Sequence, residues 1–274
     1  MKVTDAHVHV NRFDLMRPGP RALIEQNPTF PLMERCVRDP AAFLEHLDGE
    51  GVARAWLINY CARDVMGYGW EVNPWAARYA DADRSRLVPI GGYDPRHDGE
   101  GERAAEALRD LGIRGVKVHP VHQALSAADA RLFPLYAALE RLRMSLVVHT
   151  GTSRFPGADN AFADPAPLAT VLARFPRLQV LLAHGGRPDR TRAALDLVAR
   201  FPNAWLELSG CPPHRLLDYF GDLRALAPRT VWGSDWPGPG VPGMRANVEA
   251  LRALGLGAAA EAAILHGNAD ALIP

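Results

Sequence analysis

The segment Asp5-Ala6-His7-Val8-His9 combines residue types and a spacing that suit metal binding. It reads as a β-strand, where side chains alternate between the two faces, so residues 5, 7 and 9 are expected on one side. Two imidazoles on one face can bind the same divalent ion at roughly 2.0–2.1 Å. An ordinary core strand has little use for such a pair, because buried ring nitrogens need polar partners. The spacing therefore predicts that His7 and His9 are metal ligands.

Further chemically active side chains follow the later apolar runs of the chain. In order, they are Lys117, His119, His149, His184 and Asp235. Neutral imidazole and carboxylate are the ligands that zinc and similar divalent ions prefer. The predicted ligand set is His7, His9, His149 and Asp235. Such a set leaves one coordination position open for water.

The open position predicts a hydrolytic chemistry. Water bound to a divalent ion is acidified and becomes a nucleophile near neutral pH. His184 then receives a proton-transfer role, because the ordinary pKa of imidazole suits that work. We expect one zinc ion, with manganese or cobalt as alternatives.

These side chains need a scaffold that brings strand ends together, and the apolar pattern predicts one. Strands are expected at residues 3–8, 53–59, 87–91, 115–118, 145–149, 179–183, 204–208 and 230–233. Helical patterns lie between them at 104–111, 132–143, 167–175, 190–201 and 213–226. Several strands are continuously apolar, as in parallel sheets covered on both faces. The pattern favours an α/β fold, a (β/α)8 TIM barrel, in which function lies at the carboxyl ends of the strands. A doubly wound open sheet is the alternative, but no glycine-rich phosphate loop follows the first strand.

No change in composition divides the chain, so a single domain over residues 1–274 is expected. The longest irregular stretch, residues 11–40, follows the first strand and is predicted to be a lid loop. Within it, Phe13 and Phe30 are expected to supply an aromatic wall. Arg17 and Arg35 are expected to supply an anion clamp for a carboxylated substrate.

Composition excludes several classes of function. The formal net charge is zero and no basic tract occurs, so nucleic-acid binding has no electrostatic footprint. No apolar run approaches the roughly 20 residues that span a bilayer, and no basic-then-apolar leader opens the sequence. The 3 cysteines have no metal-knot spacing. We therefore expect a cytoplasmic enzyme acting on a small molecule without nucleic-acid or membrane partners, and a homodimer is possible.

Six short motifs in this order carry a family resemblance. They are Asp5-Ala6-His7-Val8-His9, Gly115-Val116-Lys117-Val118-His119-Pro120, Val148-His149-Thr150, Ala183-His184-Gly185-Gly186, Gly233-Ser234-Asp235-Trp236-Pro237 and Gly267-Asn268-Ala269. The chain resembles the amidohydrolase superfamily, in its amidohydrolase-related branch of hydrolases and decarboxylases similar to aminocarboxymuconate-semialdehyde and γ-resorcylate decarboxylases. The resemblance implies a TIM barrel with one divalent metal, usually zinc. It assigns the metal to the four ligands named above, proton transfer to His184, and to Asp235 the second role of a catalytic general base.

Two interpretations stay open for several residues. Lys117 is either a bridging ligand for a second metal or, together with His119, a substrate contact. Arg187 either holds a substrate carboxylate through two hydrogen bonds or is solvated at the start of a helix. Glu207 either lines the pocket or only forms a salt bridge.

Three further side chains are expected near the site or away from it. Trp236 is expected to form a wall of the substrate pocket. Asp5 is expected to hold a ligand by hydrogen bonding rather than to bind the ion itself. His122 is expected at the surface.

The leading hypothesis is a metal-dependent hydrolase of a small ester, lactone or amide. The alternative is a non-oxidative decarboxylase (lyase) of an unsaturated or aromatic carboxylic acid, since the branch uses one metal scaffold for both reactions. A catalytically silent binding protein is a third hypothesis, but every expected ligand type is present. The length of the chain and the Lys117–Pro120 motif favour hydrolysis by resemblance alone.

Overall fold

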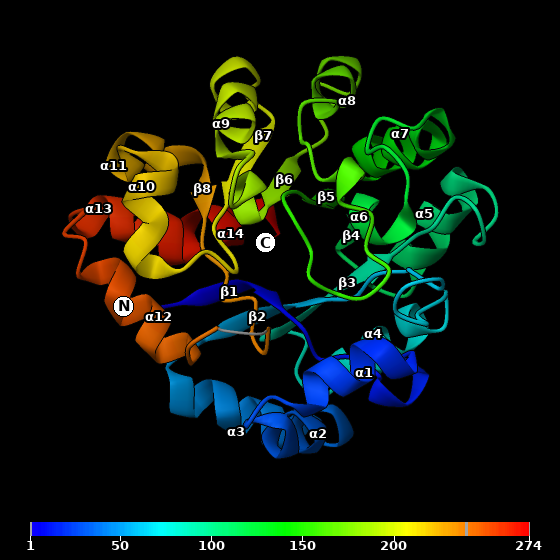
Figure 1. Ribbon diagram of the computed structural model, residues 1–274, viewed down its shortest axis with the longest axis horizontal. Helices are drawn as coiled ribbons and strands as arrows, with labels where there is room; N and C mark the ends of the chain where they lie inside the picture. The colour runs from blue at the N-terminus through cyan, green and yellow to red at the C-terminus, as the bar shows by residue number, and fades with distance from the viewer. Residues whose placement is uncertain (1, 239–240, 274) are drawn as a thin grey trace.

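The computed structural model describes residues 2–238 and 241–273, and within them eight parallel strands form a ring surrounded by helices (Figure 1). The strands are β1 Thr4–Val8, β2 Arg54–Ile58, β3 Leu87–Gly92, β4 Gly115–Val118, β5 Ser145–His149, β6 Val180–Ala183, β7 Ala204–Glu207 and β8 Thr230–Val231. Each strand pairs with the next one in chain order. The predicted TIM-barrel fold is confirmed, and each expected strand overlaps an observed one.

Helices connect successive strands and cover the outside of the ring (Figure 1). They are α1 Pro18–Glu25, α2 Phe30–Arg38, α3 Pro40–Glu50, α4 Val72–Ala80, α5 Gly101–Asp110, α6 Pro120–Gln123, α7 Phe133–Leu142, α8 Leu168–Arg174, α9 Thr191–Arg200, α10 Leu216–Phe220, α11 Leu223–Leu226, α12 Met244–Arg252, α13 Ala258–Ala262 and α14 Asn268–Leu272. None of the helices in the part of the chain that the structure describes is long and apolar enough to cross a membrane.

Backbone hydrogen bonds between β1 and the segment after β8 close the barrel. The N–H of Ala6 donates to the carbonyl of Trp232 at 3.1 Å, and that of Asp235 donates to the carbonyl of His7 at 2.9 Å. The N–H of His9 donates to the carbonyl of Trp236 at 2.8 Å. Closure therefore places the two predicted histidine ligands beside the predicted aspartate ligand, although more than two hundred residues separate them along the chain.

The apolar core has two parts. The larger cluster lies between the outer faces of the strands and the helices and includes Val8, Leu57 and Leu146. The smaller cluster gathers alternate strand residues such as Trp56 and Leu181 with residues of the last helix, and it fills the barrel interior. Packing on both faces explains why the strands are continuously apolar.

A β-bulge changes the face alternation of β1. The register against β2 shifts between Asp5 and Val8. Ala6 accordingly packs in the interior cluster, whereas Val8 packs in the outer one. Strict alternation over residues 5, 7 and 9 therefore does not hold through the whole segment.

Two expectations about helical segments are wrong. Residues 213–226 do not form one helical segment, because α10 ends at Gly221, whose φ of 65° stops the helix before α11 begins. Residues 11–40 are not an irregular loop but hold α1 and α2, each with a proline in its first turn. Proline is favoured at a helix start, so prolines that suggested a loop instead mark where these helices begin.

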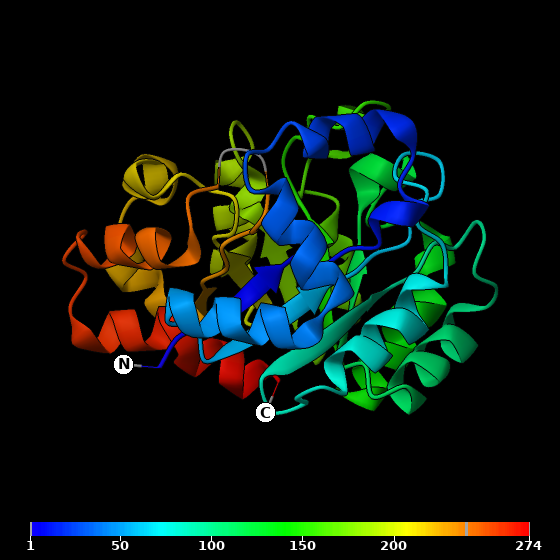
Figure 2. The same cartoon turned by 90° about the horizontal axis from the view of Figure 1, so that it is seen from below.

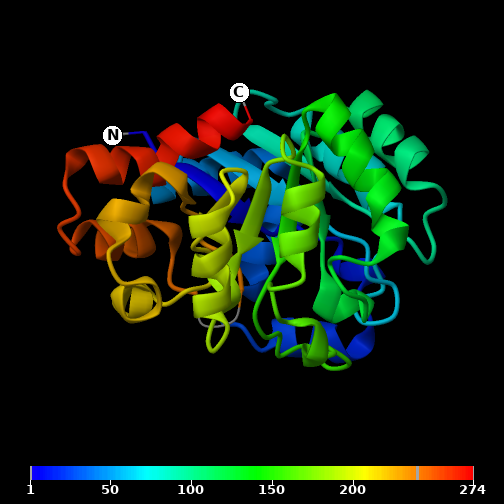
Figure 3. The same cartoon turned by 90° about the horizontal axis from the view of Figure 1, so that it is seen from above.

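The two ends of the barrel are covered by different parts of the chain. Figures 2 and 3 show α1 at one end of the molecule and both termini at the opposite end. The N-terminal end of β1 lies beside the termini, so α1 covers the end at which the strands finish. Function is expected at that end of a TIM barrel.

Candidate metal centre

The strand exits surround a cavity of about 400 Å3 at the end of the barrel covered by α1. Its lining contains most of the predicted site residues, namely His9, Lys117, His119, His149, His184, Arg187 and Asp235. Phe13, Met16, Leu23 and Ile24 line it from the segment before α1 and from α1 itself. The segment predicted to be a lid therefore covers the cavity, with helical structure.

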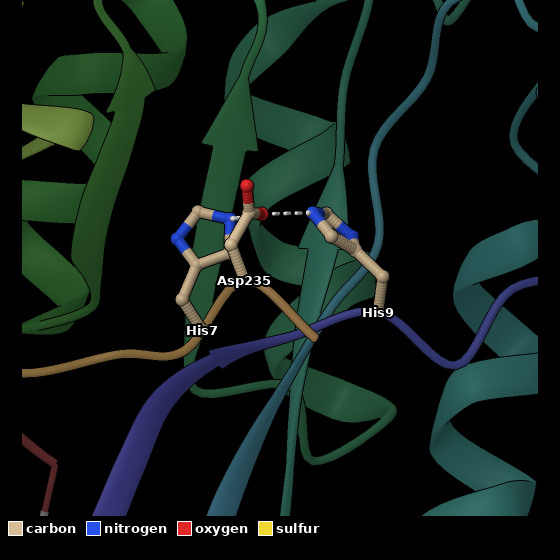
Figure 4. Close-up of side chains that lie close together, drawn as sticks. All are labelled: His7, His9 and Asp235. Atoms are coloured by element: carbon tan, nitrogen blue, oxygen red, sulfur yellow. Dashed lines mark ion pairs between the residues drawn. The ribbon is translucent and has the colours of Figure 1, made fainter. Parts of the chain in front are cut away.

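His7, His9 and Asp235 converge on one another (Figure 4). His9 and Asp235 line the floor of the cavity, and His7 is fully buried beside them. One potential ligand atom from each lies within 4.8 Å of the other two. Nε2 of His9 is 3.2 Å from Oδ1 of Asp235, and Nε2 of His7 is 3.7 Å from the same oxygen. The histidines come from the end of β1 and the aspartate from the segment after β8.

Hydrogen bonds at the far side of each ring decide which nitrogen faces this centre. Nδ1 of His7 lies 2.9 Å from a carboxylate oxygen of Glu207, and Nδ1 of His9 lies 3.0 Å from the carbonyl oxygen of Ile58. A carbonyl oxygen and an ionised carboxylate only accept hydrogen bonds, so Nδ1 of His9 carries the proton, and Nδ1 of His7 carries it whenever Glu207 is ionised. The Nε2 lone pairs of His7 and His9 are therefore directed to Asp235.

Such a donor set fits a divalent cation. Nε2 of His7 is buried and has no hydrogen-bond partner among the described residues. Burial lowers the pKa of His7 well below its ordinary value, which keeps the ring neutral. Burial alone raises the pKa of Asp235, but its contact with His9 and the charges nearby, among them Arg187, lower it to about 2. Two lone pairs and an ionised carboxylate face one another, and a cation between them relieves that repulsion.

His149 lies beside this group but outside it. Its ring stacks on His119 with centroids 3.8 Å apart and lies 4.6 Å from the ring of His184. Nε2 of His149 lies 3.2 Å from the carbonyl oxygen of Gly151, so that nitrogen carries the proton and Nδ1 carries the lone pair. The structure brings His149 to the cavity without joining it to the cluster, and its role as a fourth ligand stays a prediction.

His184 presents a lone pair at Nε2. Its Nδ1 donates to the carbonyl oxygen of Ser209 at 2.9 Å, which fixes the proton on that side. Burial, helped by the charge of Arg187, lowers the pKa of His184 well below its ordinary value. A neutral, buried imidazole that borders the cavity can accept a proton, and the role of His184 in proton transfer stays a prediction.

Two acidic residues hold the ligands from behind. Oδ1 of Asp5 accepts hydrogen bonds from the backbone N–H groups of His7 and Ser234, at 3.1 and 2.9 Å, and so ties β1 to the segment after β8. Glu207 accepts from His7 and from both the N–H and the hydroxyl of Ser209. Neither carboxylate belongs to the convergent group, so both orient other side chains.

Some expectations about the cavity need correction. Trp236 does not line it; its ring packs against His46 and Phe43, with centroids 4.7 and 5.9 Å away. It belongs to the packing between helix α3 and the barrel. Arg17 and Arg35 are also absent from the lining, because Arg17 donates to the carbonyl of Arg63 and Arg35 pairs with Glu45.

His122 lies at the cavity and not at the surface, where the sequence placed it. This residue is buried, lines the cavity and stacks on His119 with centroids 3.6 Å apart. It lies in α6, which begins at Pro120 directly after the strand exit. The spacing of three residues between His119 and His122, across a proline that starts a helix, was the available signal.

Backbone strain also marks the site. His184 and Asp235 both have φ of 67°, in the left-handed region that residues with a Cβ rarely adopt. Surrounding contacts must stabilise this conformation, and such strain gathers at functional positions. The two side chains assigned to proton transfer and metal binding are thus held in place by the fold around them.

Comparison with known proteins identifies the family. The amidohydrolase family model matches residues 4–274. The chain belongs to the amidohydrolase family. This match confirms the resemblance that its motifs indicated, to a family of hydrolases and decarboxylases.

Named relatives of this amidohydrolase include both types. It is 30% identical over 183 residues to the L-fucono-1,5-lactonase of Burkholderia ambifaria, a match that covers 57% of this chain and 58%, less than two thirds, of the lactonase. A TIM-barrel protein of Bordetella bronchiseptica superposes with a TM-score of 0.79 and 24% identity, over 100% of this chain and 98% of the other. The 5-carboxyvanillate decarboxylase of Sphingomonas paucimobilis superposes with a TM-score of 0.65 and 18% identity, over 99% and 98%. The two structural matches show the fold.

Proposed function

We propose that this amidohydrolase hydrolyses a small lactone, ester or amide with one divalent metal ion, zinc before manganese or cobalt. The observation that carries the proposal is the convergence of two imidazole lone pairs and an ionised carboxylate at the floor of the cavity. His7, His9 and Asp235 would hold the ion, with His149 as the fourth ligand. Bound there, a divalent ion would supply a Lewis acid for the scissile carbonyl and a water of lowered pKa.

The residues around the centre handle protons and position the substrate. Asp235 stays ionised near neutral pH and accepts a proton as the nucleophile forms. His184, neutral and with its Nε2 lone pair unused by Ser209, takes up a proton and returns it to the leaving oxygen or nitrogen. Lys117, His119 and Arg187 border the same cavity and are the proposed substrate contacts.

A lactone is the preferred substrate type. The relative that is 30% identical is a lactonase, and the cavity of about 400 Å3 suits a single small ring. Decarboxylation of an unsaturated or aromatic acid is the alternative, because a 5-carboxyvanillate decarboxylase has the same fold. In that reaction a protonated acid would deliver its proton to carbon.

The test combines metal content with product analysis. Purified wild type is expected to contain about one divalent ion per chain, and His7→Ala and Asp235→Asn are expected to lose it while keeping their circular dichroism spectra. Metal-loaded wild type is then incubated with panels of lactones, esters, amides and aromatic acids. Ring opening would support the proposal, whereas release of carbon dioxide would establish the decarboxylase instead. A folded wild type that binds neither zinc, manganese nor cobalt would refute the metal centre.

Two expectations about the whole enzyme remain proposals. A homodimer is tested by sedimentation, and a cytoplasmic location by fractionating the source cells. The proposed partner is the small-molecule substrate.

A further inference from the structure

Lys117 is a buried cation without a partner. It lies on β4, its side chain borders the cavity, and it is 1% exposed. Its Nζ has no hydrogen-bond partner among the described residues. Burial lowers the pKa of the ammonium group, while the carboxylates of Glu207 and Asp235 act against that effect. Burying an ammonium group whose three N–H donors make no hydrogen bond raises the free energy of the folded state, unless an anion binds to it.

The choice of lysine at this position is exceptional in this chain. The sequence contains 29 arginines and 2 lysines. Lys2, the other lysine, is half exposed and pairs with Asp270 at 2.8 Å. Arginine serves as the cation almost everywhere else, yet the innermost cationic position of the cavity has a compact ammonium group. Such a group places a point charge where a planar guanidinium would need more room.

Arg187 presents a second unused donor in the same cavity. Its Nη2 lies 3.6 Å from Oδ2 of Asp235, and Nη1 lies 3.5 Å from the carbonyl oxygen of Thr152. Its Nε is buried without a hydrogen-bond partner. Arg187 therefore faces the metal centre with part of its donor set free.

The charges lining the cavity do not balance. Lys117, Arg154 and Arg187 contribute three positive charges, whereas Asp235 is the acidic residue among the described lining residues. A divalent ion at the proposed centre would add two more positive charges. Glu207 lies behind His7 and does not border the cavity. A ligand that fills this space without charge would leave Nζ of Lys117 and Nε of Arg187 buried without a hydrogen-bond partner among the described residues.

We propose that Lys117 and Arg187 form an anion subsite beside the metal centre that binds a carboxylate of the substrate. This assignment of the substrate class rests on the proposed function. The enzyme would hydrolyse small lactones or esters that carry a carboxylate in preference to neutral ones. Lys117 contributes the point charge at the floor, and Arg187 contributes the directional donor from the segment after β6.

Binding of a simple dicarboxylate tests the subsite without turnover. Succinate is titrated calorimetrically into the wild-type enzyme in a carboxylate-free buffer. The titration is done once with a chelator present and once after zinc loading. Neutral succinamide serves as the matched control ligand. Succinate is expected to bind in both states and succinamide in neither. Lys117→Met removes the charge at similar side-chain length and is expected to weaken succinate binding by roughly 10- to 100-fold. Arg190→Gln, which removes an exposed guanidinium that pairs with Asp189, is expected to leave it unchanged.

Thermal unfolding keeps the test decisive if the variant is altered in stability. Without succinate, Lys117→Met is expected to melt at or above the wild-type temperature, because an unpaired buried charge is removed; succinate is expected to raise the melting temperature of wild type alone. Unchanged succinate affinity in folded Lys117→Met, or binding that requires zinc, would overturn the subsite. A carbamate on Lys117, seen by carbon-13 NMR after incubation with labelled bicarbonate, would also overturn it. Failure to hydrolyse lactones, with succinate binding still dependent on Lys117, would refute the proposed function and leave the subsite standing.

Discussion

Each histidine at the metal centre commits one ring nitrogen to the protein and leaves the other for a ligand. His7 shows this most clearly, because its Nδ1–H donates to Glu207 and its buried Nε2 has no hydrogen-bond partner within residues 2–238 and 241–273. Glu207 itself receives two hydrogen bonds from Ser209, so its orientation is fixed in turn. At the scale of single residues, hydrogen bonds from the protein determine which ring nitrogen of each histidine carries the proton. For His7 the carboxylate of Glu207 makes that choice.

Glu207→Gln tests this arrangement. Each carboxylate oxygen of Glu207 accepts a hydrogen bond, so the amide must turn its NH2 group toward a donor, at His7 or at Ser209. We expect zinc affinity to fall by roughly 10- to 100-fold, measured by competition with a chelating dye. Ser209→Ala leaves the His7 contact intact and is the milder control. Wild-type affinity in Glu207→Gln would show that the carboxylate does not position His7.

At the scale of elements, the meeting of β1 with the segment after β8 decides whether the centre forms. Asp5 bridges the two through hydrogen bonds from His7 and Ser234. Gly233 makes the close approach possible, since a Cβ there would lie 2.6 Å from Cβ of His7 and 2.9 Å from Oε1 of Glu207. The absence of a side chain at Gly233 therefore serves both barrel closure and the metal ligand.

Gly233→Ala is expected to lower the free energy of unfolding by about 1–3 kcal/mol, because the new methyl group overpacks this junction. Zinc affinity should fall with it, since His7 must move. Gly49→Ala is the matched control, because nothing lies within 4 Å of a Cβ at that position of α3 and alanine favours a helix by about 0.5–1 kcal/mol. Urea unfolding measures both, and destabilisation by both changes would contradict the argument.

At the scale of the whole molecule, the barrel holds an unusual number of imidazoles out of water. Burial lowers the pKa values of five histidines that lie at or beside the cavity. They are His7, His119, His122, His149 and His184. In the unfolded chain these rings take up protons near their ordinary pKa of about 6.5, whereas in the folded barrel they stay neutral.

The metal-free enzyme is therefore expected to lose stability as pH falls below about 6.5, because the unfolded state then binds more protons than the folded one. Asp5 and Glu207 act in the opposite sense, since burial raises the pKa of each to about 7 and the folded state keeps their protons. Five imidazoles outnumber these two carboxyls, so the net effect of acid is destabilising. Urea unfolding with chelator at pH 8, 7, 6 and 5 measures the slope. A flat or rising profile on acidification would contradict it.

The sequence alone determined the fold class and most of the candidate centre. Continuous apolar strands and periodic helices predicted the barrel, and the positions of His7, His9 and Asp235 at strand exits predicted a shared site. These inferences succeed because alternation along a strand and the common end of parallel strands are local or topological rules. The prolines of residues 11–40 misled, because the same residue marks loops and helix starts.

Only the tertiary structure decided the partners. It linked His7 to Glu207, separated by 200 positions in the chain, turned Trp236 into a packing residue and buried His122 in an imidazole stack. It also left Nζ of Lys117 without a hydrogen-bond partner among the residues that the structure describes, which the sequence does not reveal. Hydrogen-bond partners, burial and ring tautomers depend on which distant segments the closed barrel brings together, and no local pattern in the chain encodes those distances.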